Sequence, residues 1–316
     1  MIDADAALAG SRRPLVLGIG GGGDVVGALA TAEAARLYHG ADPVVGGVAW
    51  ERQPIDPQPG PRAAGEIEGA EELAPCVLRA APDTRTRAGG VLFAESRMAA
   101  LLGEPTVLLD VTEGPVRLAD GLAAAADRLG CDLIVFVDVG GDVLAHGDEP
   151  GLGSPLCDAV LLASAVRLQR AGHAALGAVF GLGCDGELTV PEVNDRIAEV
   201  ARAGGLAGVR GITPPIADRL EAAVEAIPTE ASAQAVRAYR GAVGTTPIRG
   251  GRRTVELTPA AAMTIYFDPA VALETTAPLA RAVYEAGSLR EANATLRSMG
   301  LRTELDWEAD RAAGRG

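Results

Sequence analysis

Short apolar runs rich in β-branched residues alternate in this chain with stretches of helical length, and this alternation constrains the fold most strongly. Strands that are separated by helices pair in parallel, with the helices covering both faces of the sheet. The sequence therefore predicts an α/β protein with three layers and a mostly parallel, Rossmann-like sheet. The predicted strands cover residues 14–19, 44–49, 106–109, 133–137 and 174–180, and the main helices cover residues 24–38, 118–129 and 158–171.

The remaining segments predict a chain that forms one large unit with an added C-terminal part. A further strand is expected over residues 89–95, one long helix over 270–285, and a frayed tail from Glu308. We expect residues 1–228 to form the ligand-binding α/β core. Residues 229–316 then form a C-terminal extension that packs on the same domain.

The basic residues exclude several classes of enzyme. The chain contains no lysine, so all 28 basic residues are arginine. Schiff-base chemistry, a pyridoxal-phosphate linkage and a P-loop lysine are therefore excluded. Any clamp for a phosphate or a carboxylate has to use arginine, backbone N–H groups or a metal ion.

Charge and hydropathy limit the partners. A formal net charge of −14 disfavours binding to nucleic acid, whose backbone is also negative. No apolar run reaches the roughly 18 residues that a membrane span requires, and the first residues do not form a signal-peptide pattern. We expect a cytoplasmic protein that binds a small molecule, and alanine-rich helices leave room for a homo-oligomer.

The first glycine-rich loop, Gly18–Asp24, lies between a predicted strand and a predicted helix. Its spacing fits the dinucleotide pattern, and Gly20, Gly21, Gly22 and Gly23 could donate backbone N–H groups to a ligand. Asp24 at the start of the helix would repel a phosphate, which disfavours a nicotinamide dinucleotide. The alternatives are another small-ligand site, with Asp24 facing a metal, an amine or a hydroxyl, or a structural turn.

A second loop, between residues 138 and 158, carries several groups capable of chemistry. Asp138 and Asp142 could share a Mg²⁺ ion, because this cation prefers carboxylate oxygens. Asp138, His146 and Glu149 are the candidate catalytic residues. The alternative is that Asp142, Asp148 and Glu149 are solvated loop acids and that Asp158 only caps the following helix.

Other polar residues follow neighbouring predicted strands. Carboxyl ends of parallel strands meet at one edge of a sheet, so we expect these residues to line one pocket. The candidate ligand-binding residues of that pocket, in addition to the first glycine loop and Asp24, are Trp50, Glu51, Arg52, Asp110, Gly140, Gly141, Ser154 and Asp185.

Three segments together carry a resemblance to a known family. GIGGGGDVVGAL, GGVAWERQPIDPQPGPR and VDVGGDVLAHGDEPGLGSPLCDAVLL resemble, in this order, the domain-of-unknown-function 1152 family of bacterial and archaeal proteins. The resemblance extends over most of the chain and implies a cytosolic α/β protein, but no activity and no residue role. The third segment is also similar to the glycine-rich loops of carbon–oxygen lyases of the glutamate cyclase type.

Three functions fit these observations. The first is a hydrolase or transferase that acts, with Mg²⁺, on a small anionic metabolite such as a phosphorylated compound or a nucleotide. The second is a lyase or cyclase that acts on an amino acid or hydroxy acid without a metal. The third is a ligand sensor or assembly protein without catalysis.

Overall fold

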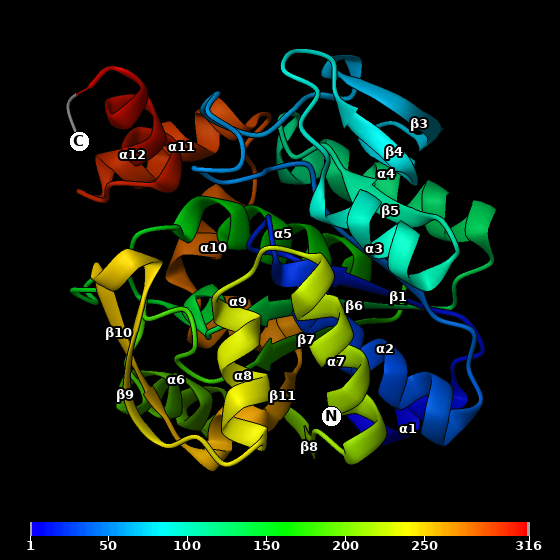
Figure 1. The fold of residues 1–316 in the computed structure, drawn as a ribbon, viewed down its shortest axis with the longest axis vertical. Helices are drawn as coiled ribbons and strands as arrows, with labels where there is room; N and C mark the ends of the chain where they lie inside the picture. Colours follow the sequence, from blue (N-terminus) through cyan, green and yellow to red (C-terminus); the bar gives the residue numbers. More distant parts are fainter. Residues whose placement is uncertain (1, 315–316) are drawn as a thin grey trace.

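The central sheet of the protein has a parallel middle and antiparallel edges (Figure 1). The computed structural model describes residues 2–314, and within them nine strands form this sheet. The parallel strands, in spatial order, are β5 (Thr106–Leu109), β2 (Val44–Val48), β1 (Pro14–Gly18), β6 (Leu133–Val139) and β7 (Ala175–Phe180). One edge carries β4 (Val77–Thr86) and β3 (Ile67–Ala74), and the other carries β11 (Met263–Phe267) and β8 (Leu206–Gly211).

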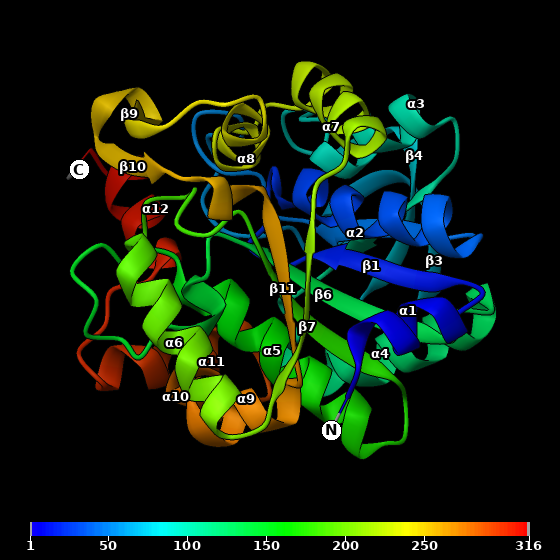
Figure 2. The ribbon, with the colours of Figure 1, turned by 90° about the horizontal axis from the view of Figure 1, so that it is seen from below.

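Helices cover both faces of this sheet (Figure 2), which confirms the predicted three-layer α/β class. One face is covered by α2 (Asp24–His39), α3 (Ala94–Leu102), α7 (Pro214–Ala226) and α8 (Ala231–Tyr239). The other is covered by α4 (Gly114–Leu129), α5 (Pro155–Arg170), α6 (Val190–Arg202), α9 (Pro269–Thr275), α10 (Pro278–Val283) and α11 (Leu289–Ser298).

The remaining elements lie around these layers. They are α1 (Ala4–Gly10), the C-terminal α12 (Glu304–Ala312), a separate hairpin of β9 (Gly244–Ile248) and β10 (Arg253–Leu257), and the 3₁₀ turns η1 (Ala64–Glu66), η2 (Asp142–Leu144), η3 (Arg249–Gly251) and η4 (Pro259–Ala262). None of the helices in residues 2–314 combines the length and the apolar composition needed to cross a bilayer.

The core explains why the parallel strands have almost no polar side chains. In β1, Leu15 and Leu17 pack into the cluster beneath α4 and α5, whereas Val16 packs into the cluster beneath α2. Side chains alternate between the two faces of a strand, so a strand that is covered on both faces needs apolar residues at every position. This requirement produces the continuous apolar runs in the sequence.

The order of the strands places a crevice between β1 and β6. From β1 the chain moves outward through β2 to β5, and α4 then returns it to β6 on the other side of β1. The helix after β1 covers one face of the sheet and the helix after β6 covers the other, so their connecting loops diverge. Ligand sites of open α/β sheets lie at such a point, outside the carboxyl ends of the strands.

Two of the predicted elements are wrong for reasons of backbone geometry. No strand forms over residues 89–95, because Gly89 and Gly90 adopt left-handed φ values of 87° and 64° and turn the chain into α3. The predicted helix over 270–285 is two helices, since Pro278 has no N–H group to continue the hydrogen bonding of α9.

The predicted frayed tail from Glu308 is also wrong. Glu308 lies within α12, and its side chain is buried. It accepts hydrogen bonds from Trp50 and Gly60, which lie in the loop after β2. The C-terminal part of the chain also supplies β11 to the central sheet. The division at residue 228 stays a prediction.

Candidate functional site

Buried acidic side chains gather where β6 and β7 end. Asp138 is the next-to-last residue of strand β6, Asp142 begins η2, and Asp158 lies in the first turn of α5. The loop after β7 adds two more carboxylates to this place. We call these five residues, all at most 6% exposed, the acidic centre: Asp138, Asp142, Asp158, Asp185 and Glu187.

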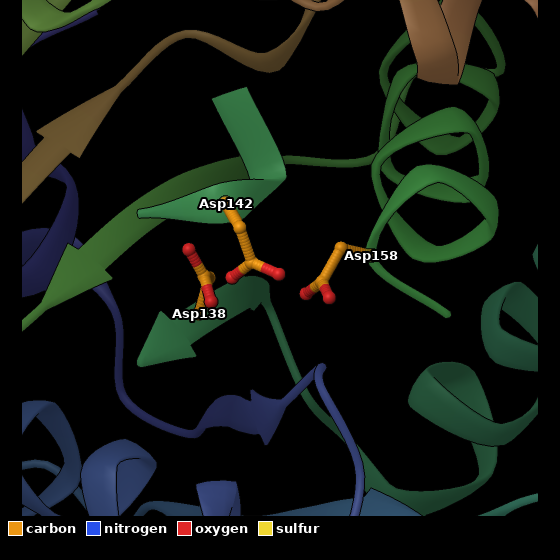
Figure 3. A group of neighbouring side chains, drawn as sticks. All are labelled: Asp138, Asp142 and Asp158. Carbon is orange, nitrogen blue, oxygen red and sulfur yellow. The ribbon is translucent and has the colours of Figure 1, made fainter. Parts of the chain in front are cut away.

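Asp138, Asp142 and Asp158 form the first triad of the acidic centre. Their carboxylate groups point toward one another (Figure 3), and one oxygen from each lies within 4.8 Å of the others. Opposite ligands of an octahedral Mg²⁺ lie about 4.2 Å apart, twice a bond of about 2.1 Å. The triad therefore has roughly the spacing that a single cation requires.

Asp142, Asp185 and Glu187 form a second triad with similar spacing but a different charge balance. Glu187 accepts hydrogen bonds from the N–H groups of Gly153 and Ser154, at 2.6 and 2.8 Å, and pairs with Arg253 at 3.0 Å. These partners hold the pKa of Glu187 below its usual value despite burial. A cation would have to compete with them, so the first triad is the better metal site.

No arginine within residues 2–314 forms an ion pair with a carboxylate of the first triad, in contrast to Glu187. Asp138 accepts hydrogen bonds from the N–H groups of Gly141 and Val143, but Asp158 Oδ1 is buried without a hydrogen-bond partner among the described residues. Burial, followed by the neighbouring carboxylates, raises the pKa of each of these three side chains well above its usual range. A bound cation would favour the charged form of these carboxylates, whereas burial and mutual repulsion without one favour the protonated form.

Asp24 lies beside the acidic centre at the start of α2. Its Oδ2 accepts a hydrogen bond from the N–H group of Gly20 at 2.9 Å. Burial raises the pKa of Asp24 to about 7, although this hydrogen bond and the charge of Arg52 oppose the rise. A carboxyl group with a pKa near neutrality can both take up and release a proton.

Glycines allow the carboxylates to approach the backbone. A Cβ atom on Gly20 would lie 2.5 Å from Asp24 Oδ2, and one on Gly140 would lie 2.2 Å from Asp185 Oδ1. Gly140 also has a φ of 131°, which residues with a side chain rarely adopt. Asp185 Oδ1 is a second buried oxygen without a partner within residues 2–314, and burial raises the pKa of this side chain to about 7.

The predicted N–H donors of the first glycine loop are partly occupied. The N–H group of Gly20 binds Asp24, and that of Gly22 donates to the carbonyl of Trp50 at 3.0 Å. Gly21 and Gly22 adopt left-handed conformations, and Gly23 packs closely on Thr229. The loop thus shapes the wall of the acidic centre around Asp24.

The side chains of the loop after β2 make several contacts with other parts of the protein. Trp50 is fully buried, donates from Nε1 to Glu308 at 3.0 Å, and has Arg52 stacked on its ring at 4.1 Å. Arg52 also donates to the Gly20 carbonyl at 2.7 Å and pairs with Glu304 at 3.6 Å. These contacts explain how Trp50 packs, and they place Arg52 beside the first glycine loop.

Glu51 and Asp110 each accept hydrogen bonds from the protein, and their ligand-binding role stays a prediction. Glu51 accepts from the N–H group of Ala94 at the start of α3, at 2.6 Å. Asp110 accepts from the N–H groups of Ala64 and Thr112, at 2.7 and 2.9 Å. The structure does not bring either carboxylate into the acidic centre.

His146 and Glu149 belong to a separate network on α6. His146 Nε2 lies 2.9 Å from Glu199, and Glu149 accepts from the N–H groups of His146 and Gly147. Arg196 pairs with Glu149 at 3.1 Å. The catalytic role of His146 and Glu149 stays a prediction. Neither residue is part of the acidic centre.

The structure revises the roles of the residues around the start of α5. Asp158 is not a cap, because it lies inside the helix and its carboxylate faces Asp138 and Asp142. Ser154 at the cap position donates its hydroxyl to Glu187. Glu304 of α12 accepts from the N–H groups of Leu156 and Cys157. Sequence analysis missed Glu304, since its part in the site depends on how α12 packs.

One family matches this chain. The model described as "Protein of unknown function (DUF1152)" matches residues 15–312, which confirms the resemblance expected from the three loop segments. No curated protein and no solved structure matches the chain. These comparisons assign no activity to the chain.

Proposed function

The chain belongs to the DUF1152 family of proteins of unknown function, and from that premise we propose that it is an enzyme that uses a divalent cation to act on a small anionic metabolite. The observation that carries this proposal is the first triad. Its three carboxylates converge in a buried place, and one oxygen, Asp158 Oδ1, has no hydrogen-bond partner in the described part of the chain. Mg²⁺ is the cation that suits an all-oxygen ligand set.

Charge balance supports a cation at this position. Three ionised carboxylates in a buried place repel one another and lose their hydration, which is unfavourable without a compensating charge. A bound cation would displace the protons of the three acids and replace this repulsion with attraction. The second triad already has Arg253 and Arg249 beside Glu187, so its need for a cation is smaller.

The neighbouring residues suit group transfer or hydrolysis. A divalent cation polarises a substrate oxygen or a water molecule. Asp24, with a pKa of about 7, would accept or donate the proton that such a reaction moves. Its place across the β1–β6 crevice from Asp138 puts this proton carrier at the point where open α/β sheets bind ligands.

Calorimetric titration with Mg²⁺ tests the metal part. The wild-type protein should bind Mg²⁺ at pH 8, and Asp158→Asn and Asp142→Asn should each weaken binding by more than about tenfold, because each removes a charged ligand. Asp127→Asn is the matched control, since Asp127 is exposed on α4. Absence of binding to the wild type, or equal affinity in all four proteins, would contradict the proposal.

A turnover assay separates the three candidate functions. The purified protein is incubated with a panel of phosphorylated metabolites and nucleotides, with Mg²⁺ or with EDTA, and products are measured by mass spectrometry. The proposal predicts turnover that stops in EDTA and in Asp24→Asn. Turnover of an amino acid or hydroxy acid that persists in EDTA would favour a lyase or cyclase, and tight binding without product would favour a sensor.

A further inference from the structure

Asp142 belongs to both triads of the acidic centre. It shares the first triad with Asp138 and Asp158, and it shares the second triad with Asp185 and Glu187. In each triad, one oxygen of every member lies within 4.8 Å of an oxygen of the other two members. A carboxylate has two oxygens with about four lone-pair sites, so a single carboxylate can ligate two cations at once. Asp142 is therefore placed to join two cation sites.

Backbone hydrogen bonds hold the two triads beside each other. The N–H group of Gly140, after β6, donates to the carbonyl of Phe180 at 3.0 Å. The N–H group of Gly183, after β7, donates to the carbonyl of Gly140 at 2.8 Å. The neighbouring strands β6 and β7 thus end in loops that are bonded to each other. The backbone of these loops fixes the positions from which the carboxylates project.

Asp185 gives the second triad a buried oxygen that lacks a partner. Asp185 is 5% exposed, and its Oδ1 has no hydrogen-bond partner within residues 2–314. This oxygen faces the segment that joins Asp138 to Asp142, because a Cβ atom on Gly140 would lie only 2.2 Å from it. A buried polar atom without a partner is unfavourable, and an ion that binds to it removes this penalty.

Arg253 of β10 lies beside Glu187 in the second triad. Its Nη1 is 3.0 Å from Glu187 Oε1, and Arg249 Nη2 is 3.7 Å from the same oxygen. Arg253 Nη1 is nevertheless buried without a hydrogen bond of good geometry in the described part of the chain. The guanidinium group therefore supplies a positive charge here without a directed hydrogen bond from this nitrogen. A cation can supply the same charge.

The charges of the acidic centre leave room for a second cation. The five carboxylates carry five negative charges when all are ionised. One divalent cation in the first triad, together with Arg253 and Arg249, supplies four positive charges, so one negative charge stays without a counterpart. A second divalent cation balances that charge and leaves one positive charge in excess. Such an excess attracts an anionic substrate.

We propose that the acidic centre binds two divalent cations that share Asp142 as a bridging ligand. The first cation binds in the first triad. The second binds in the second triad, and it binds more weakly because it competes with Arg253 for Glu187.

This inference rests on the proposed function and names its substrate class. Two cations about 3.5–4 Å apart stabilise both the attacking and the leaving oxygen of an in-line displacement. An in-line displacement at phosphorus is the reaction of phosphate esters and anhydrides. The anionic metabolite of the proposed function is therefore a phosphorylated compound.

Titration with Mn²⁺ alone, followed by electron paramagnetic resonance, tests this proposal. Mn²⁺ binds to the same oxygen ligands as Mg²⁺, and the spectrum distinguishes free from bound ions. The wild-type protein should bind two Mn²⁺ ions in a stronger and a weaker step. The second step should add the magnetic coupling expected of two ions about 3.5–4 Å apart. A single bound ion at saturation, or a second ion without coupling, would overturn the proposal.

Asp185→Asn separates the two sites, because Asp185 belongs to the second triad alone. The second step and the magnetic coupling should disappear, while the affinity of the first step stays within about threefold of the wild-type value. Asp195→Asn, at an exposed position in α6, is the matched control and should keep both steps. A coupled second ion in Asp185→Asn would overturn the proposal.

Arg253→Gln tests the competition for Glu187 without removing a ligand. The second step should become about fivefold tighter or more, because a positive charge beside Glu187 is lost. Arg252→Gln removes the same charge from the exposed neighbouring residue and should leave the second step within about twofold of wild type. Unchanged or weaker binding of the second ion in Arg253→Gln would contradict the proposed competition.

The pair of cations and the proposed function can fail separately in this experiment. A single Mn²⁺ ion that is lost in Asp158→Asn would overturn the pair and leave the proposed function standing. Absence of Mn²⁺ binding to the wild-type protein would contradict both.

Discussion

Glu95 is a buried acid outside the acidic centre, and it gives a test of residue-level electrostatics. It is fully buried in α3, and neither of its carboxyl oxygens has a hydrogen-bond partner in the described chain. Burial, with a further contribution from the charge of Glu51, raises the pKa of Glu95 well above its usual value. The folded protein therefore binds the proton of the Glu95 carboxyl group more tightly than the unfolded chain does.

This difference predicts a pH-dependent effect of Glu95→Gln. Between the unfolded pKa near 4.5 and the raised folded pKa, the wild type loses stability as pH rises, because the folded state binds more protons. The variant cannot ionise, so its free energy of unfolding relative to wild type should increase by more than about 1.4 kcal/mol between pH 4 and pH 8, the equivalent of one pKa unit.

Urea denaturation across this pH range, in EDTA, measures the difference. Glu225→Gln, at an exposed position in α7, is the control and should track the wild type at every pH. A constant difference between Glu95→Gln and wild type from pH 4 to pH 8 would show that folding does not raise the pKa of Glu95.

Individual residues of the site were predictable from strand ends, but their partners were not. The position of Asp138 after an apolar run predicted a residue at the sheet edge, and it lies there. In one alternative Asp158 only capped the helix, but its place inside α5 turns it toward Asp138 and Asp142. A helix boundary that moves by three residues changes the direction of a side chain, and sequence patterns do not fix boundaries so closely.

At the level of elements, α12 connects the C-terminal part of the chain to the candidate site. Glu304 accepts hydrogen bonds from the N–H groups of Leu156 and Cys157, at 3.0 and 2.8 Å, at the positive end of α5. Arg52 lies 3.6 Å from the same carboxylate. The start of α5, which carries Asp158, thus depends on a residue about 150 positions away.

We expect Glu304→Ala to lower the free energy of unfolding by about 2 kcal/mol, because it leaves two buried N–H groups without an acceptor. Glu304→Gln keeps a side-chain acceptor and should lose less. Urea denaturation of the three proteins at pH 7 gives the comparison. Equal stability of Glu304→Ala and wild type would mean that α12 does not hold α5 as described.

The elements that sequence analysis missed are those that are not buried on both faces. The edge strand β3 exposes Glu71 and Glu72 and contains Gly69 at a bulge, so it lacks a continuous apolar run. The tail was expected to fray because chain ends are often poorly ordered. Glu308 is nevertheless buried and accepts hydrogen bonds from Trp50 and Gly60. Such long-range contacts leave no periodic signal in the local sequence.

For the whole molecule, the strand order explains why one site forms from distant segments. The five parallel strands were all predicted, because burial on both faces requires apolar runs, and their order puts the loops after β1 and β6 on either side of one crevice. The contributions of the β9–β10 hairpin and α12 depend on tertiary packing. The centre of the site was therefore accessible from the sequence, whereas the contacts that the hairpin and α12 make with it, through Arg253 and Glu304, were not.

The most direct test of the cation site is a crystal structure of the wild-type protein grown with Mn²⁺, which replaces Mg²⁺ at oxygen ligands and gives an anomalous signal. The account predicts one anomalous peak between Asp138, Asp142 and Asp158, bonded to at least one oxygen of each, and no such peak in Asp158→Asn. A wild-type map without a peak among these three carboxylates would contradict it.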